Sequence, residues 1–308
     1  MARNVILVAD PGIDGAFAIA LALHDPDINV LGLAATAGNV SAEQATQNTQ
    51  IVIDQIDPTR WPRVGAALPA EYDVDGTKIH GPGGLGGMSF PCADLHHMHP
   101  SDKLLIDLLH LHPKDITVIT MGPLTVLARA FDRDPELPSL VHRLICLGGA
   151  WHEPGNVSAV AEFHFYCDPL AARKVLHCGA PVTLIPLDVM RKVLFSPTDL
   201  LELPVPESKT CRFLRQIIPY GIGATCNQYG IEGFHLKDVV GLVALALPEA
   251  VTTKPMVADV EVRGELTRGM SVIDARPWRT GTPNVELAVN VDVEAVRAYI
   301  DRTLRRTA

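Results

Sequence analysis

The sequence lacks the signatures of several common protein classes. Its six cysteines form no Cys-x-x-Cys pair, which excludes zinc ribbons and thioredoxin-like redox sites. No Gly-x-Ser-x-Gly elbow of the serine hydrolases occurs. The glycine-rich stretch at residues 80–87 follows no strand and precedes no Gly-Lys-Ser/Thr, so it is neither a dinucleotide fingerprint nor a phosphate-binding loop.

The chain also has little positive charge and no long apolar run. Its 26 Lys and Arg residues against 35 Asp and Glu residues argue against a nucleic-acid partner, because phosphate contacts need clustered basic side chains. No stretch reaches the roughly 20 apolar residues of a membrane span. The segment after Met1 is too short and too soon broken for a signal peptide. Cysteines such as Cys146 and Cys167 lie in apolar contexts that suit a reducing compartment, so we expect a cytoplasmic protein.

What the chain does have is an alternation of strand and helix signals over 308 residues, of which 47% are hydrophobic. Apolar or β-branched runs end in Gly, Pro or polar residues, and amphipathic stretches follow them. This succession predicts an α/β fold with a mostly parallel central sheet flanked by helices. No linker, repeat or low-complexity tract interrupts it, so residues 1–308 are expected to form a single domain. The strands are expected at residues 5–8, 29–36, 62–67, 116–120, 144–147, 182–186 and 257–263.

Acidic residues lie beside strand ends or Gly and Pro turns. Asp10 and Asp14 follow the first strand, and Glu162, Asp188 and Asp238 have similar settings. In open α/β sheets such turns gather at one edge, where ligands bind. Clustered carboxylates can hold a hard cation, activate water or bind a sugar diol, and they need a cation or shared protons to offset their repulsion. Helix caps and solvated surface acids remain the alternative for each of them.

The order of short motifs is more specific than any one of them. They are Asp10-Pro11-Gly12-Ile13-Asp14, Ala37-Gly38-Asn39, His80-Gly81 with Gly84-Leu85-Gly86, Gly122-Pro123-Leu124-Thr125, Gly148-Gly149-Ala150, Gly155-Asn156, Ala161-Glu162-Phe163, Asp168-Pro169, Leu187-Asp188-Val189 and Asp238. In this order, nearly end to end, the sequence resembles the inosine-uridine preferring nucleoside hydrolases. The resemblance implies a Rossmann-like nucleoside hydrolase fold, a homodimer or homotetramer, and cleavage of a ribonucleoside to ribose and a free base.

The resemblance also implies roles for individual residues. A calcium ion at the pocket floor would hold the attacking water and the ribose 2′- and 3′-hydroxyls. Its ligands here would be Asp10, Asp238 and the backbone carbonyl of Met121, and Asp10 would also be the general base. The transition state would resemble an oxocarbenium ion. The residues expected to bind ribose or help to orient water are Asp14, Asn39, Asn156, Glu162 and His164.

Four positions depart from the family pattern. The family's Asp-x-Asp-Pro-Gly-x-Asp-Asp motif has Val8 in place of its first aspartate and Gly15 in place of its last, which is normally a calcium ligand. Calcium takes about six to eight oxygen ligands, so we expect weakened calcium binding. His164 replaces an asparagine, and Lys237 replaces a histidine proposed in some members to protonate the leaving group.

These departures leave several functions open. Our principal hypothesis is a hydrolase with Asp10 as general base. One alternative is a catalytically impaired homologue that binds a nucleoside or ribose. Another is a metal-independent variant in which Lys237 and His164 act as acid or base. Lys237 would bring positive charge near the aspartates and partly replace calcium, unless it is only an exposed residue at a helix start. Base recognition is expected to involve residues 70–100 and 219–235.

Overall fold

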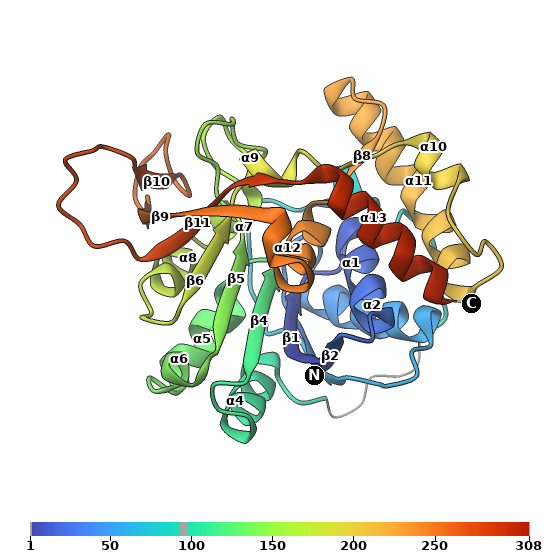
Figure 1. The fold of residues 1–308 in the computed structure, drawn as a ribbon, viewed down its shortest axis with the longest axis horizontal. Coiled ribbons are helices and arrows are strands. Elements are labelled where there is room, and N and C mark those ends of the chain that lie inside the picture. The colour runs from blue at the N-terminus through green and yellow to red at the C-terminus, as the bar shows by residue number, and fades with distance from the viewer. Residues whose placement is uncertain (1, 93–97, 308) are drawn as a thin grey trace.

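A nine-stranded sheet runs through the centre of the computed structural model, which describes residues 2–92 and 98–307 (Figure 1). The strand order is β10-β9-β11-β6-β5-β4-β1-β2-β3. All neighbouring pairs from β11 to β3 are parallel, whereas β9 pairs antiparallel with β10 and β11. The expected mostly parallel sheet is therefore confirmed. The strands are β1 (Arg3–Ala9), β2 (Ile28–Ala35), β3 (Arg63–Gly65), β4 (Ile116–Met121), β5 (Arg143–Leu147), β6 (Val182–Ile185), β9 (Val251–Val260), β10 (Ser271–Asp274) and β11 (Val285–Val291), and a separate pair is formed by β7 (Leu194–Phe195) and β8 (Phe234–His235).

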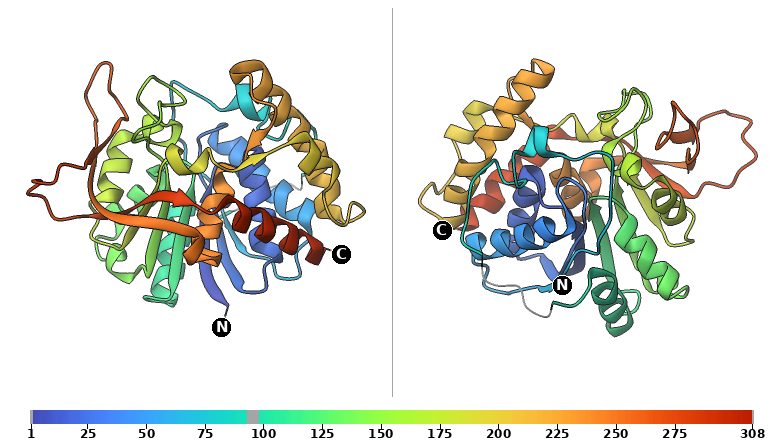
Figure 2. Two further views of the ribbon diagram at one scale, coloured as in Figure 1. Left: turned by 45° about the horizontal axis from the view of Figure 1, so that its top comes forward. Right: turned by 180° about the vertical axis from the view of Figure 1, so that it is seen from behind.

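Helices cover both faces of the sheet (Figure 2). On β1, Val5 and Leu7 pack into one hydrophobic cluster, and Ile6 and Val8 pack into the other, because successive strand residues point to opposite faces. The first cluster includes residues of α1, α2, α11, α12 and α13, and the second includes residues of α4, α5 and α8. The helices are α1 (Ile13–His24), α2 (Ala42–Ile56), α3 (Thr77–His80), α4 (Ser101–Leu111), α5 (Thr125–Arg133), α6 (Leu137–Leu140), α7 (Phe163–Cys167), α8 (Pro169–Leu176), α9 (Leu187–Met190), α10 (Pro197–Leu201), α11 (Lys209–Tyr229), α12 (Lys237–Ala246) and α13 (Val293–Leu304).

Helix α11 is longer than its sequence suggests, because it runs through Pro219 and two glycines. Proline removes one backbone hydrogen bond from a helix, and glycine weakens it. Packing overrides both effects here. Leu214 and Ile217 are fully buried, and a Cβ at Gly221 would come within 2.7 Å of the Phe234 ring. Gly221 therefore lets β8 lie close against the helix.

The register of the parallel strands brings their carboxyl ends to one edge. Ala9, the last residue of β1, lies opposite Ala35 at the end of β2 and Met121 at the end of β4. The residues that follow these strands therefore emerge together, as expected for ligand sites of open α/β sheets. Among the described residues, no helix combines the length and the apolar character needed to cross a bilayer.

Candidate active site

A cavity of about 870 Å³ opens at this edge of the sheet, a size that suits a small-molecule ligand. Parts of both loop regions expected to meet a ligand line it, including residues 73–76, 78–80, 228–229 and 234–235. Residues 93–97 of the first region lie outside the described part of the chain. The sequence-predicted site residues that line the cavity are Asp14, Asn39, Asn156, Glu162, His164, Lys237 and Asp238.

Asp10 lies just past β1 and is only 1% exposed, so it is not among the residues that line the cavity. The loop after β2 holds its carboxylate. The backbone N–H of Asn39 donates to Asp10 Oδ2 at 2.8 Å, and Asn39 Nδ2 donates to the Asp10 carbonyl at 3.0 Å. Burial raises the pKa of Asp10 to about 7, although nearby His164 and the hydrogen bond from Asn39 act in the opposite direction. Asp10 therefore exchanges its proton near neutral pH.

Two glycines allow the chain to surround the Asp10 carboxylate closely. A Cβ at Gly38 would overlap Asp10 Oδ2 and would lie 2.7 Å from Pro123 Cδ. A Cβ at Gly122, directly after β4, would lie 3.1 Å from Asp10 Oδ1. The Ala37-Gly38-Asn39 and Gly122-Pro123 motifs therefore pack closely around the Asp10 side chain.

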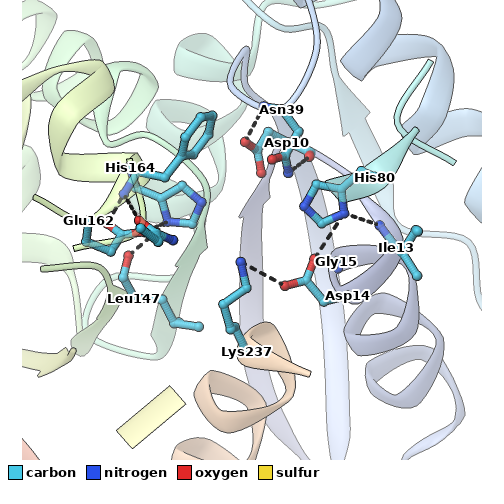
Figure 3. A network of polar contacts seen from close by, with 12 residues as sticks. Asp10, Ile13, Asp14, Gly15, Asn39, His80, Leu147, Glu162, His164 and Lys237 are labelled. Carbon is cyan, nitrogen blue, oxygen red and sulfur yellow. Dashed lines mark hydrogen bonds and ion pairs between the residues drawn. The ribbon is translucent and has the colours of Figure 1, made fainter. Parts of the chain in front are cut away.

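The first turns of two helices meet beside Asp10. Asp14 lies in the first turn of α1, and Lys237 and Asp238 begin α12. Lys237 Nζ lies 3.7 Å from Asp14 Oδ2 (Figure 3). The Asp14 side chain is 4% exposed and that of Lys237 is 25% exposed. The partly exposed ammonium therefore pairs with a buried carboxylate in the wall of the cavity.

This ion pair sets the charges of the cluster. Burial acts to raise the pKa of Asp14, but the Lys237 ammonium outweighs burial and holds that pKa below its ordinary value. Burial acts to lower the pKa of Lys237, but Asp14 and the other nearby carboxylates raise it overall. Asp238 has the opposite shift, because burial and the Asp14 charge raise its pKa well above the ordinary value. Lys237 therefore favours the charged form of Asp14, whereas burial and the Asp14 charge favour the protonated form of Asp238.

His80, at the end of α3, faces the same space (Figure 3). Its Nδ1 accepts a hydrogen bond of 3.1 Å from the backbone N–H of Ile13, so the neutral ring carries its proton on Nε2. Burial lowers the pKa of His80 to about 4. Although Nδ1 lies 3.8 Å from Asp14 Oδ1, His80 is neutral near pH 7 and does not balance the Asp14 charge. His80 is not among the site residues predicted from the sequence, and its place in the His80-Gly81 motif is the signal that could have identified it.

Glu162 and His164 form the opposite wall. Glu162 caps α7, and its Oε2 accepts from the N–H groups of Gly149 at 3.2 Å, His164 at 3.0 Å and Phe165 at 3.3 Å. His164 Nδ1 lies 3.2 Å from the Leu147 carbonyl oxygen, which can only accept, so Nδ1 carries a hydrogen. The lone pair of a neutral His164 is then on Nε2, on the cavity side of the ring (Figure 3).

Three further sites complete the placement of the predicted residues. Asn156 Oδ1 accepts from the Phe163 N–H at 2.8 Å, which leaves its Nδ2 as a donor. Met121 ends β4 with a buried side chain and does not line the cavity. Val8 is fully buried in the apolar cluster on one face of the sheet, where a carboxylate would be costly.

These residues do not make a calcium site as they are placed. The described part of the chain contains no group of three or more His, Cys, Asp or Glu side chains arranged to hold a metal ion. Gly15 supplies no side-chain oxygen, Asp10 Oδ2 accepts from Asn39, and Asp14 faces the Lys237 ammonium. A calcium ion takes about six to eight oxygens and is repelled by a neighbouring cation.

Comparisons with known proteins cover almost the whole chain. Residues 5–298 match the family model of the inosine-uridine preferring nucleoside hydrolases. The inosine-uridine preferring nucleoside hydrolase of Leishmania major is 32% identical over 311 residues, which cover 99% of this chain and 98% of that protein. The probable uridine nucleosidase 2 of Oryza sativa is 33% identical over 318 residues, covering 98% of this chain and 93% of that protein.

Solved structures agree with the sequence matches. A plant nucleoside hydrolase superposes with a TM-score of 0.91 at 29% identity and covers 99% of each chain. A purine-preferring ribonucleoside hydrolase from Gardnerella vaginalis superposes with a TM-score of 0.90 at 28% identity, covering 99% of this chain and 98% of that one. The likeness therefore extends over the entire fold.

Replacing Gly38 by alanine tests the packing around Asp10. Because the new Cβ would overlap the Asp10 carboxylate, the variant should lose about 1–3 kcal/mol of unfolding free energy, the usual cost of overpacking. Thermal melting measures this as a fall of several degrees. Gly223→Ala is the matched control, since a Cβ there meets nothing within 4 Å and alanine favours the helix. Equal melting temperatures for Gly38→Ala and the wild type would contradict the described packing.

Proposed function

The chain belongs to the inosine-uridine preferring nucleoside hydrolase family, and we propose that it hydrolyses the N-glycosidic bond of a ribonucleoside to ribose and a free base. The observation that carries this proposal is the buried Asp10 carboxylate, whose pKa is raised to about 7 and which lies directly behind Asn39, a residue that lines the cavity. A general base is most effective when its pKa is near the working pH.

The cavity is lined by acidic, amide and aromatic side chains. Asp14, Asp238 and Asn39 are polar groups that suit the hydroxyl groups of ribose. Tyr229, Phe234 and His235 contribute ring surfaces that suit a planar base. His235 Nδ1 is buried without a hydrogen-bond partner among the described residues, and burial lowers the pKa of His235 to about 4. The uncharged His235 ring therefore adds a planar surface to the wall of the cavity.

The chemistry follows from these groups. Asp10 removes a proton from a water molecule as the water oxygen bonds to C1′ of the ribose. The bond between C1′ and the base nitrogen breaks, and its electron pair leaves with the base. Positive charge develops on the ribose ring, and the negative charge on Asp14 stabilises it. The ring proton on His80 Nε2 is a further donor for a ligand oxygen.

A metal-independent variant with a different base is the second candidate. The observation that favours it is the contact of His164 Nδ1 with the Leu147 carbonyl oxygen at 3.2 Å, which leaves Nε2 as the ring nitrogen free to accept a proton. In that case His164 would take the proton of water, with Lys237 as acid or cation, and Asp10 would act by charge alone. A catalytically impaired homologue that only binds a nucleoside is the third reading. All three bind the same ligand class.

We also propose that residues 1–308 form a single cytoplasmic domain that assembles as a homodimer or homotetramer. The position of β11 beside β6 supports the single domain, because it places the C-terminal strands in the same sheet as the N-terminal half. Light scattering on the purified protein measures the assembly. A mass of 33.2 kDa, that of one chain, would contradict the oligomer.

Asp10→Asn tests the assignment of the general base. Asparagine keeps the shape and the hydrogen bond from Asn39 but cannot take a proton, so kcat should fall about 10²–10⁴-fold. In the wild type, kcat/KM should fall as the pH drops below about 7, because Asp10 becomes protonated. Base release from a panel of nucleosides measures both effects.

Asp115→Asn is the matched control, because Asp115 is an exposed residue that bonds Asn4. It should leave kcat unchanged. An active Asp10→Asn variant together with an inactive His164→Gln variant would transfer the role of base to His164. Absence of base release from every nucleoside would contradict the hydrolase proposal itself.

The same substitution predicts a pH-dependent change in stability. The pKa of Asp10 is raised from 3.8 to about 7 in the folded protein, so the folded state binds this proton more tightly than the unfolded state. Stability is therefore lost as the pH rises through this interval, by an amount on the order of a few kcal/mol. Asp10→Asn should be more stable than the wild type at pH 9, with this advantage absent at pH 4. Urea unfolding at both pH values measures the difference, and a pH-independent difference would contradict the raised pKa.

A further inference from the structure

The acids at the cavity floor need positive charge. Asp14 and Asp238 are each at most 5% exposed, and Asp10 and Glu162 lie close enough to raise the pKa of Lys237 together with them. Buried carboxylates without a counter-charge are strongly destabilising. Among the described residues, the side chains within ion-pair distance of Asp14 are those of His80 and Lys237. His80 is neutral near pH 7, so Lys237 supplies the positive charge.

Gly15 and Lys237 lie on the same group of acids. A Cβ at Gly15 would lie 3.2 Å from Asp238 Oδ2, so the position of the missing family aspartate faces Asp238. Lys237 immediately precedes Asp238 and contacts Asp14. The position of the missing family aspartate and the Lys237 ammonium therefore lie beside the same group of acids.

Together, the two substitutions change the charge of the site by the same amount as the ion that they would replace. Glycine in place of aspartate removes one negative charge, and lysine in place of neutral histidine adds one positive charge. Their sum is +2, the charge of Ca²⁺. Lysine at the start of a helix is electrostatically unfavourable, because the amino end of a helix carries partial positive charge. The pairing with Asp14 offsets this cost and fixes the position of the ammonium.

We propose that the Lys237 ammonium is the resident cation of the site, replaces a divalent ion, and binds the vicinal hydroxyls of a ribose together with Asp14 and Asp238. An ammonium has three N–H donors, so donors remain for ligand oxygens beyond the contact with Asp14. The hydroxyl protons of the diol can in turn bond the acids. The identity of the sugar rests on the proposed function, whereas the replacement of the metal does not require turnover.

The first test is calcium titration of the wild-type protein. Melting temperature and calorimetric heat should not change with millimolar calcium, and base release should be the same in a chelator. A calcium-dependent rise in melting temperature, or base release that a chelator abolishes and calcium restores, would overturn the proposal. The binding measurement decides the question even if no nucleoside is turned over, so failure of the hydrolase proposal is separately visible.

The second test restores the family pattern with Gly15→Asp and Lys237→His together. Without a cation the added aspartate is repelled by the charged Asp14, so the double variant should melt below the wild type. Calcium should then raise its melting temperature by several degrees, and terbium bound there should luminesce. A double variant that responds to neither ion would contradict the claim that Lys237 occupies the place of an ion.

A single substitution keeps the proposal testable if the double variant does not fold. Lys237→Gln should weaken the binding of ribose or a nucleoside at least tenfold, through a raised KM or Kd. Lys209→Gln is the matched control, because Lys209 pairs with Asp57 at the surface and does not line the cavity. Unchanged affinity in Lys237→Gln would overturn the role of the ammonium.

Discussion

The arrangement of the site is governed by the free-energy cost of placing several carboxylates in one buried pocket. Removing a charged carboxylate from water is expensive unless hydrogen bonds or an opposite charge compensate. Each acid has a different compensation here. Backbone N–H groups hold Glu162, the Asn39 N–H holds Asp10, and the Lys237 ammonium faces Asp14. Asp238 has the raised pKa that results when an acid retains its proton.

The fold explains why these groups meet. Helices α1 and α12 pack against each other on one face of the sheet, and both begin at the edge where the parallel strands end. Their first turns bring Asp14, Lys237 and Asp238 together. Exposed N–H groups and the partial positive charge at a helix start favour nearby carboxylates. The apolar packing of the two helices therefore holds the charged groups of the site in position.

Much of this arrangement could be predicted from local sequence. The apolar runs that end in Asp10 and Asn39 predict buried strands with polar residues at one edge, because strand period and turn chemistry are local properties. The path of α11 through Pro219 could not be predicted, because tertiary packing overrides local propensity there. The role of His80 depends on a bond to Ile13 from a distant part of the chain. The contact of Lys237 with Asp14 likewise depends on how two helices pack, so sequence could only suggest it.

The central claim is that a lysine ammonium, and not a divalent ion, balances the acids at the floor of the cavity. A crystal structure of the protein grown with millimolar calcium and a nucleoside analogue tests this claim most directly. We expect Lys237 Nζ to be in ion-pair contact with Asp14, with both groups against the ribose hydroxyls. An ion held by six or more oxygens at about 2.3–2.6 Å, with Lys237 turned toward solvent, would contradict it.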